Sequence, residues 1–182
     1  MDPQRLKAHF ASVGEKGEDL VAYFFADLFR RAPHLRGAFP PSTARLQGKL
    51  LEALAHIVSL VDDPPALVPY LRDLGRRHGD LGVANEHYPR FGASLLAALA
   101  HFTGPDWNDD LESDWATVYS FAAQIMAEAA SERVAEREAE RAAERAAAAV
   151  PRQDGPRRAG HGGLERVAAG RAAAERGPGR FR

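Results

Sequence analysis

Apolar residues recur at spacings of four and three along most of this chain. The longest run steps through residues 111–129 without a miss. Its members are Leu111, Trp115, Val118, Ala122, Ile125 and Ala129. This period lines the apolar side chains along one face of an α-helix, whereas a strand would alternate polar and apolar residues. Because almost no stretch shows that alternation, the sequence predicts an all-α fold.

Residues that start or stop helices divide the rest of the chain. A first helix is expected over residues 3–12, and a second begins near Glu18, whose charge favours a helix N-terminus. Ala32-Pro33 ends the second helix, because the residue before a proline disfavours helical geometry. Ser42 can cap a third helix, and a turn at residues 62–65 separates it from a fourth.

The fourth helix carries a histidine where an apolar residue is expected. Leu67, Leu71 and Leu74 form its apolar face, and the next step of four reaches His78. Gly79 is expected to stop this helix. Taken alone, an imidazole at such a position is more often a hydrogen-bonded core residue than a ligand. In an all-helical chain, a histidine at the end of a leucine-lined slot also suits a planar apolar cofactor held by one axial ligand.

Two other polar residues lie in apolar register. Tyr88 opens the stripe of a helix that runs to Phe102, and Glu132 occupies the step that follows Ala129. Together with His78, they put polar groups on three different apolar faces. This placement favours a functional site, with chance as the alternative interpretation.

Composition limits the classes of function. The chain of 182 residues is 45% hydrophobic, has no cysteine, and has no run near the roughly 18 apolar residues of a membrane span. It also lacks an apolar segment at its start, so a cytoplasmic protein is expected. The seven histidines show no zinc-site spacing, and there is no phosphate-binding loop or GxSxG motif.

The formal net charge of −1 hides an asymmetry. Residues 151–182 hold eight arginines against three acids, which is +5 and leaves −6 for the first 150 residues. An acidic body does not favour nucleic acid binding. Residues 133–150 repeat Glu-Arg among alanines, which predicts a solvated helical extension. Residues 151–182 are expected to be a disordered basic tail, either a tether or a dispensable end.

The segment from Leu74 to Leu96 resembles the proximal region of bacterial globins. His78 stands four residues before Gly82-Val83 and ten before Tyr88. The pattern is similar to that of the globin domain of flavohaemoglobins and of Vitreoscilla-type single-domain haemoglobins. The resemblance implies a globin fold in which His78 binds the haem iron.

Residues outside this segment add to the resemblance. Phe39, followed by a proline, resembles the phenylalanine that packs on the haem in nearly all globins. Trp115 and Tyr119 match a WxxxY motif of the last helix. The likeness runs from about residue 3 to residue 132, so we expect a globin domain over residues 1–132.

The resemblance also implies a chemistry. The cofactor would be haem b, iron protoporphyrin IX, which binds dioxygen, nitric oxide and carbon monoxide. In the family, a histidine, a tyrosine and a glutamate form a hydrogen-bonded relay behind the iron, here assigned to His78, Tyr88 and Glu132. A carboxylate that accepts the imidazole N–H makes the histidine a stronger electron donor. Alternatively, Glu132 merely begins the Glu-Arg repeat.

The other side of the expected pocket departs from the family pattern. Flavohaemoglobins carry a tyrosine that hydrogen-bonds the bound oxygen, and here the matching position is Phe25. Tyr23 cannot replace it, because two residues rotate about 200° around a helix. The usual distal glutamine corresponds to Leu46 if Leu50 lies over the haem, or to Gln47 if the register shifts by one. The apolar stripe favours Leu50, so an apolar pocket is expected, with Gln47 beside it.

These expectations leave several functions open. Nitric oxide dioxygenation would need a separate flavin- and NAD(P)H-dependent reductase, since nothing in the chain resembles a nucleotide-binding domain. The rivals are an oxygen carrier or store, and a gas sensor that signals through the charged helix. The pocket would be walled by Phe25, Phe39, Leu46, Leu50 and Val83. The oligomeric state is not predicted.

Overall fold

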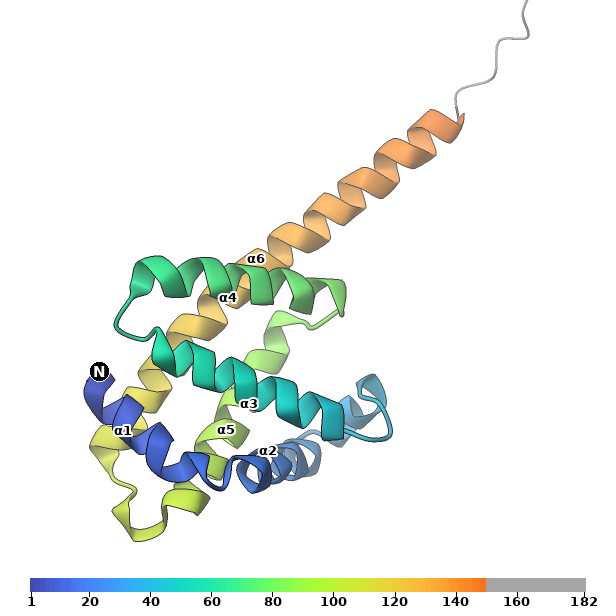
Figure 1. Ribbon diagram of the computed structural model, residues 1–182. Coiled ribbons are helices and arrows are strands. Elements are labelled where there is room, and N and C mark those ends of the chain that lie inside the picture. Colours follow the sequence, from blue (N-terminus) through green and yellow to red (C-terminus); the bar gives the residue numbers. More distant parts are fainter. Residues whose placement is uncertain (150–182) are drawn as a thin grey trace, which may run out of the picture.

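The computed structural model describes residues 1–149, which form six α-helices and three short 3-10 helices (Figure 1). The α-helices are α1 (Pro3–Gly14), α2 (Gly17–Arg31), α3 (Ala44–Ser59), α4 (Pro64–Asp80), α5 (Tyr88–Thr103) and α6 (Asp109–Ala149). The 3-10 helices are η1 (Pro33–Ala38), η2 (Asn85–His87) and η3 (Gly104–Asp106). No strand forms within the described residues, which confirms the all-α prediction. The predicted tail at 151–182 lies outside them.

Aspartate side chains hold the starts of two helices. Asp2 accepts hydrogen bonds from the backbone N–H groups of Gln4 and Arg5, at 2.9 and 3.2 Å. Asp63 caps α4, where the N–H of Ala66 donates to its carboxylate at 3.2 Å. Each carboxylate satisfies N–H groups that the first turn of a helix leaves unpaired. These caps set where α1 and α4 begin.

The end of α4 differs from the prediction. Gly79 does not stop the helix, which continues to Asp80. The chain turns at Gly82 instead, where a φ of 74° favours glycine because a Cβ would be strained. Gly79 therefore has a role other than helix termination.

The start of α3 is closer to the prediction, since the Ser42 hydroxyl accepts a hydrogen bond from the Ala44 N–H at 3.4 Å.

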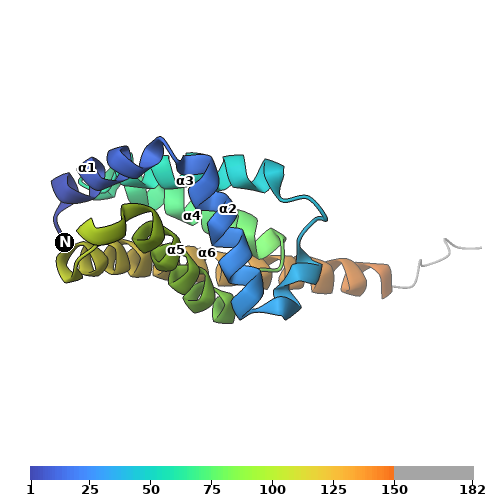
Figure 2. The ribbon, with the colours of Figure 1, turned by 90° about the horizontal axis from the view of Figure 1, so that it is seen from below.

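The helices pack unevenly. α4 lies mainly on α6 and α2 on α5, whereas α4 has few contacts with α3. α6 runs along one side of the body and continues beyond it (Figures 1 and 2). The residues of α6 after Arg137 are exposed. Among the described residues, no helix is both long and apolar enough to cross a bilayer.

The apolar interior consists of two clusters. The larger joins α1, α2, α3, α5 and the start of α6, with Leu28, Leu99 and Trp115 almost fully buried in it. The smaller lies around α4 and α6, and Ile57 of α3 packs against both clusters. Its buried members are Leu67, Leu71, Tyr88, Ala122 and Met126. The boundary between the clusters therefore passes between α3 and α4.

A buried histidine joins α1, α5 and α6. The indole N–H of Trp115 donates to His9 Nδ1 at 2.9 Å, and His9 Nε2 lies 2.7 Å from the Thr103 hydroxyl oxygen. That hydroxyl donates to the Leu99 carbonyl at 2.6 Å. Because Nδ1 can accept only when it carries no proton, His9 is neutral with its proton on Nε2. Burial lowers the pKa of His9 in the same direction.

We expect the folded protein to lose stability when His9 becomes protonated. Because folding lowers its pKa, the contribution of His9 is complete above the unfolded value of about 6.5 and is lost as the pH falls below it. The free energy of unfolding, measured in urea between about pH 7.5 and about pH 5, should fall less steeply in His9→Gln than in the unmodified protein. Equal slopes for His9→Gln and the unmodified protein would contradict this expectation.

Candidate functional site

His78 lies in the last turns of α4 and its tautomer is determined by its own helix. Nδ1 of His78 is 2.8 Å from the carbonyl oxygen of Leu74. Since a carbonyl can only accept, Nδ1 carries the proton and the lone pair of the neutral ring is on Nε2. Burial lowers the pKa of His78, against the opposing effect of the Leu74 carbonyl. Within residues 1–149 no hydrogen bond forms to Nε2, so this nitrogen is available as a ligand.

The surroundings of His78 are apolar. The Tyr88 ring lies almost parallel to the imidazole, with ring centroids 6.4 Å apart and planes inclined by 28°. Leu74 and Val83 are half-buried against the smaller cluster, and the Val83 N–H donates to the His78 carbonyl at 3.0 Å. This bond holds the loop after α4 close to His78. The imidazole is thus framed by apolar groups from α4, from this loop and from α5.

The other side of the cluster boundary carries phenylalanines and leucines. Leu46 and Leu50 of α3 are half-buried against the larger cluster. The Phe39 ring centroid lies 5.9 Å from that of Phe25 and 5.2 Å from that of Phe29. These side chains and those around His78 belong to two different apolar clusters, and α3 and α4 have few contacts with each other; we call the boundary between the clusters the slot. A flat apolar group with one metal ligand is the kind of molecule such a slot can hold.

Aromatic residues beyond the predicted set take part in this wall. Phe91 of α5 lies 6.4 Å from Phe39, and Phe29 is 5.9 Å from Phe25, both between ring centroids. Phe29 could have been found from the sequence, because it follows Phe25 by one helical turn. The contact between Phe91 and Phe39 joins segments far apart in the chain, so spacing alone could not reveal it.

Hydrogen-bond donors are scarce on the side of the cluster boundary that carries Phe25 of α2 and Leu46 and Leu50 of α3, which we call the α3 side. Phe25, at the position where the resembling family has a tyrosine, is 6% exposed. Tyr23 stacks on His101 with ring centroids 4.4 Å apart, on a different face of α2. The side-chain amide of Gln47 donates to the Thr43 hydroxyl of its own helix at 3.2 Å. Leu46, the other candidate for the distal position, is apolar. The α3 side is therefore largely apolar, with few free hydrogen-bond donors.

The predicted relay behind His78 does not form in this structure. Glu132 accepts a hydrogen bond from Arg72 at 2.5 Å, and its side chain is 48% exposed. The proton of His78 Nδ1 is used by the Leu74 carbonyl, and the buried Tyr88 hydroxyl has no partner among the described residues. The three residues are therefore not joined by hydrogen bonds. Glu132 follows the apolar spacing of α6, yet at this point the helix is leaving the body and the residue faces an arginine.

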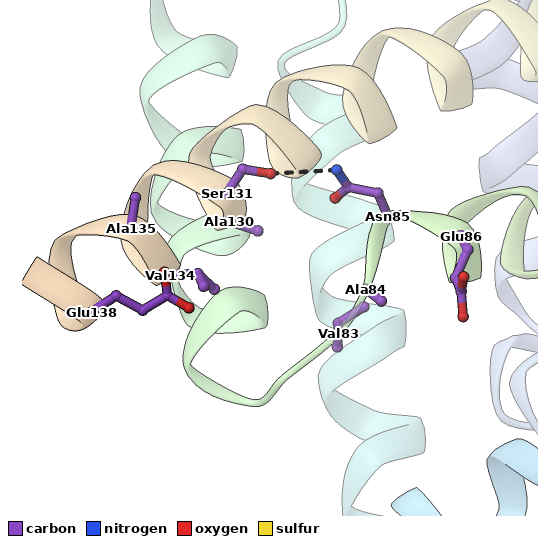
Figure 3. A pocket seen from close by; sticks show the side chains of 9 residues that line it. All are labelled: Val83, Ala84, Asn85, Glu86, Ala130, Ser131, Val134, Ala135 and Glu138. Atoms are coloured by element: carbon purple, nitrogen blue, oxygen red, sulfur yellow. Dashed lines mark hydrogen bonds between the residues drawn. The ribbon is translucent and has the colours of Figure 1, made fainter.

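A shallow groove of about 450 Å³ lies between the loop after α4 and α6 (Figure 3). Val83 and Val134 line it, and the Asn85 amide donates to the Ser131 hydroxyl at 3.3 Å within it. Neither His78 nor the phenylalanines around Phe39 contribute to its lining. The groove is therefore separate from the slot between α3 and α4.

Comparison with known proteins identifies the family. The globin family model matches residues 22–126, which is more than half of the chain. The chain belongs to the globin family. A flavohemoprotein from Chromobacterium violaceum is 30% identical over 124 residues, which make up 66% of this chain and 31% of that protein. The globin thus spans about a third of the length of the curated relatives that it matches.

Solved bacterial structures share the fold. An engineered carbene transferase from Rhodothermus marinus, whose name proposes a nitric oxide dioxygenase, superposes with a TM-score of 0.65 at 27% identity. It covers 77% of this chain and 95% of its own. A globin from Campylobacter jejuni has a TM-score of 0.64 at 22% identity, covering 71% and 94% of the two chains. These likenesses confirm the globin fold that the sequence predicts.

The family and its flavohemoprotein relatives imply haem binding, and the slot is consistent with it. His78 presents a free Nε2 on a neutral imidazole, which is the form that binds a metal. The side chains on both sides of the cluster boundary are apolar, as the faces of a porphyrin require. Within residues 1–149, no group of three or more His, Asp or Glu side chains is placed to hold a metal ion by itself. The residues present therefore fit a haem better than a bare metal ion.

We expect Tyr88→Phe to leave the protein at least as stable as before. The Tyr88 hydroxyl is buried without a partner, so its removal deletes no hydrogen bond and relieves the cost of burying a polar group. Tyr119→Phe is the matched comparison, because the Tyr119 hydroxyl donates to the Tyr88 carbonyl at 2.6 Å and its loss should cost about 1 kcal/mol. The free energy of unfolding in urea measures both. A loss in Tyr88→Phe as large as in Tyr119→Phe would show that the Tyr88 hydroxyl has a partner.

Proposed function

We propose that this globin binds haem b through Nε2 of His78 and uses it to bind dioxygen and other diatomic gases. The observation that carries the proposal is a neutral imidazole with its Nδ1 proton engaged and its Nε2 free, at the boundary of two apolar clusters. A bound haem supplies an iron that binds dioxygen, nitric oxide and carbon monoxide and changes oxidation state. The protein supplies the ligand, the orientation and a dry environment.

The residues of the slot have distinct tasks in this proposal. The Leu74 carbonyl holds the ring of His78 in one orientation by accepting its proton. The Phe39 ring packs beside Phe25 and Phe29, which keeps water from the α3 side. Leu46 and Leu50 close that side, with Gln47 at its margin, and Val83 closes the α4 side. An apolar enclosure of this kind slows loss of an electron to solvent and protects the ferrous state.

Nitric oxide dioxygenation is the reaction that we propose, with electrons from a separate flavin- and NAD(P)H-dependent reductase. It is supported by flavohemoprotein relatives and by a structural neighbour whose name proposes the same activity. The reaction consumes dioxygen and nitric oxide and yields nitrate. In this chain His78 would hold the iron and the apolar wall would exclude water. Under a reducing system, nitrate formation from nitric oxide at a rate that depends on dioxygen would support this reaction.

A carrier or store of dioxygen is the second candidate, and two observations favour it. The α3 side provides Phe25 where a tyrosine hydroxyl could bond a bound gas. Glu132 is occupied by Arg72, so no carboxylate acts on the His78 proton and the ligand is a weaker donor. Reversible dioxygen uptake without nitrate formation would favour this candidate over the dioxygenase.

The haem proposal predicts an absorption spectrum that depends on His78. The purified protein, reduced and then exposed to carbon monoxide, should show a Soret band that His78→Gly loses or reshapes because the side chain that would bind the iron is gone. Added imidazole should restore the original spectrum of His78→Gly by entering the space left by the side chain. His56→Gly, at an exposed histidine of α3, is the control and should keep the original band. Absence of any Soret band from the unmodified protein supplied with haem would end the proposal.

A second prediction concerns the α3 side. Phe25→Tyr should slow dioxygen dissociation about tenfold or more, because a hydroxyl donor to a polarised bound gas contributes about 1.5–3 kcal/mol. Stopped-flow mixing of the oxygenated protein with carbon monoxide measures the rate. Tyr23→Phe serves as the control, since Tyr23 stacks on His101 away from the slot. An unchanged rate in Phe25→Tyr would mean that position 25 does not face the bound gas.

A further inference from the structure

Ion pairs tie the helix of His78 to α6. Arg72 donates to Glu132 at 2.5 Å, and Arg76 holds both carboxylate oxygens of Glu136, at 3.0 and 2.6 Å. Asp80 accepts from Arg133 and Arg137 at 2.9 and 3.3 Å. We call these residues the α4–α6 seam. Its α4 members are Arg72, Arg76 and Asp80, and its α6 members are Glu132, Arg133, Glu136 and Arg137.

Below the seam, the two helix backbones touch. A Cβ on Gly75 would lie 2.4 Å from the carbonyl oxygen of Met126, and one on Gly79 would lie 2.7 Å from that of Ala130. Both distances are shorter than any real contact of a Cβ. This close approach explains the glycine at position 79, which the sequence alone suggested as a helix stop.

Glycine contacts bring the helices together but resist sliding only weakly. Side chains that interdigitate fix the position of one helix along another, and Gly75 and Gly79 have none to insert. The seam supplies what they lack, because its two arginine–glutamate pairs follow the same order along both helices, Arg72 with Glu132 and then Arg76 with Glu136. A shift of one helix along the other by less than a full turn would break these pairs.

The geometry of α4 places the seam away from the slot. Arg72, Arg76 and Asp80 are four residues apart and share one row of the helix. His78 follows Arg76 by two residues, a rotation of about 200°, so it lies on the opposite side. The seam can therefore move the imidazole only through the backbone of α4. α4 has its main contacts with α6, where Leu67 and Leu71 share a buried cluster with Ala122 and Met126, and the seam extends this contact to the end of α4 that carries His78.

We propose that the α4–α6 seam positions His78 for the haem iron, with Glu132 and Glu136 as its positioning residues. The inference rests on the proposed haem binding and extends it to residues that do not touch the slot. The α6 half of the seam lies beyond residues 22–126, the part that matches the globin family model. The proposal also assigns a structural role to the first turns of the charged helical extension, which the sequence predicts to be solvated.

The test compares the unmodified full chain with the double variant Glu132→Gln/Glu136→Gln, both loaded with haem. In the variant, the iron–histidine stretching band of the ferrous protein, recorded by resonance Raman spectroscopy, should broaden and shift. Haem transfer to a scavenging protein should become about fivefold faster, the size expected for a few exposed ion pairs. Hydrogen exchange of the haem-free chain should increase in α4 and stay unchanged in α5. Because the paired side chains are 40–48% exposed, high salt should change the stretching band, the haem transfer rate and the hydrogen exchange of the unmodified protein in the same direction.

Two further variants separate positioning from general damage. Glu140→Gln/Glu144→Gln removes the same charge from α6 at carboxylates that have no ion pair within residues 1–149, and should behave like the unmodified protein. Glu132→Arg should resemble the double variant, and adding Arg72→Glu should restore the band by reversing the pair. If Glu132→Gln/Glu136→Gln matches the Glu140→Gln/Glu144→Gln control in band, haem transfer and exchange, the seam does not position His78. If the unmodified protein binds no haem, the proposed function fails and the inference falls with it.

Discussion

The contact of α4 with α6 determines where the site can be. Backbone touches backbone at Gly75 and Gly79, so α4 is held against α6 and has few contacts with α3. The apolar interior is consequently split into two clusters, and His78 lies where they meet. A larger side chain at either glycine would force α4 and α6 apart. Two residues without side chains thus allow α4 to lie directly on the backbone of α6.

The chemistry available at the slot depends on which polar groups already form hydrogen bonds within the protein. The proton of His78 goes to the Leu74 carbonyl, which leaves Nε2 as the free ligand. The carboxylate of Glu132 goes to Arg72, and no other carboxylate among the described residues bonds to the imidazole. On the opposite side, Phe25 brings a ring and no donor. In the proposed site, His78 would be a neutral ligand beside a largely apolar gas pocket, and this balance keeps dioxygen storage beside nitric oxide dioxygenation as a candidate.

Much of the architecture could be predicted because helix periodicity is a local property. The stripe from Leu111 to Ala129 predicted the buried face of α6 over the length where the helix crosses the body. The same counting failed at Glu132, because spacing says which side of a helix a residue occupies but not whether another element still covers that side. It failed at Gly79 for a related reason, since a glycine near a helix end looks alike whether it turns the chain or admits a neighbouring backbone. Among the candidate site residues, His78 was predicted from the apolar stripe of its helix and from the resemblance to a family, Phe25 and Phe39 from the resemblance, and their mutual contacts were not predicted.

The sequence by itself determined the all-helical class, the apolar faces and the identity of the candidate ligand, because each depends on residues within a few turns of one another. Only the tertiary structure decided that Glu132 pairs with Arg72, that His9 bonds Trp115, and that α4 stays apart from α3. These outcomes depend on which partners arrive from distant segments. A buried or charged group takes the nearest partner with suitable geometry, and the distance between such groups is set by packing of whole helices rather than by their spacing along the chain.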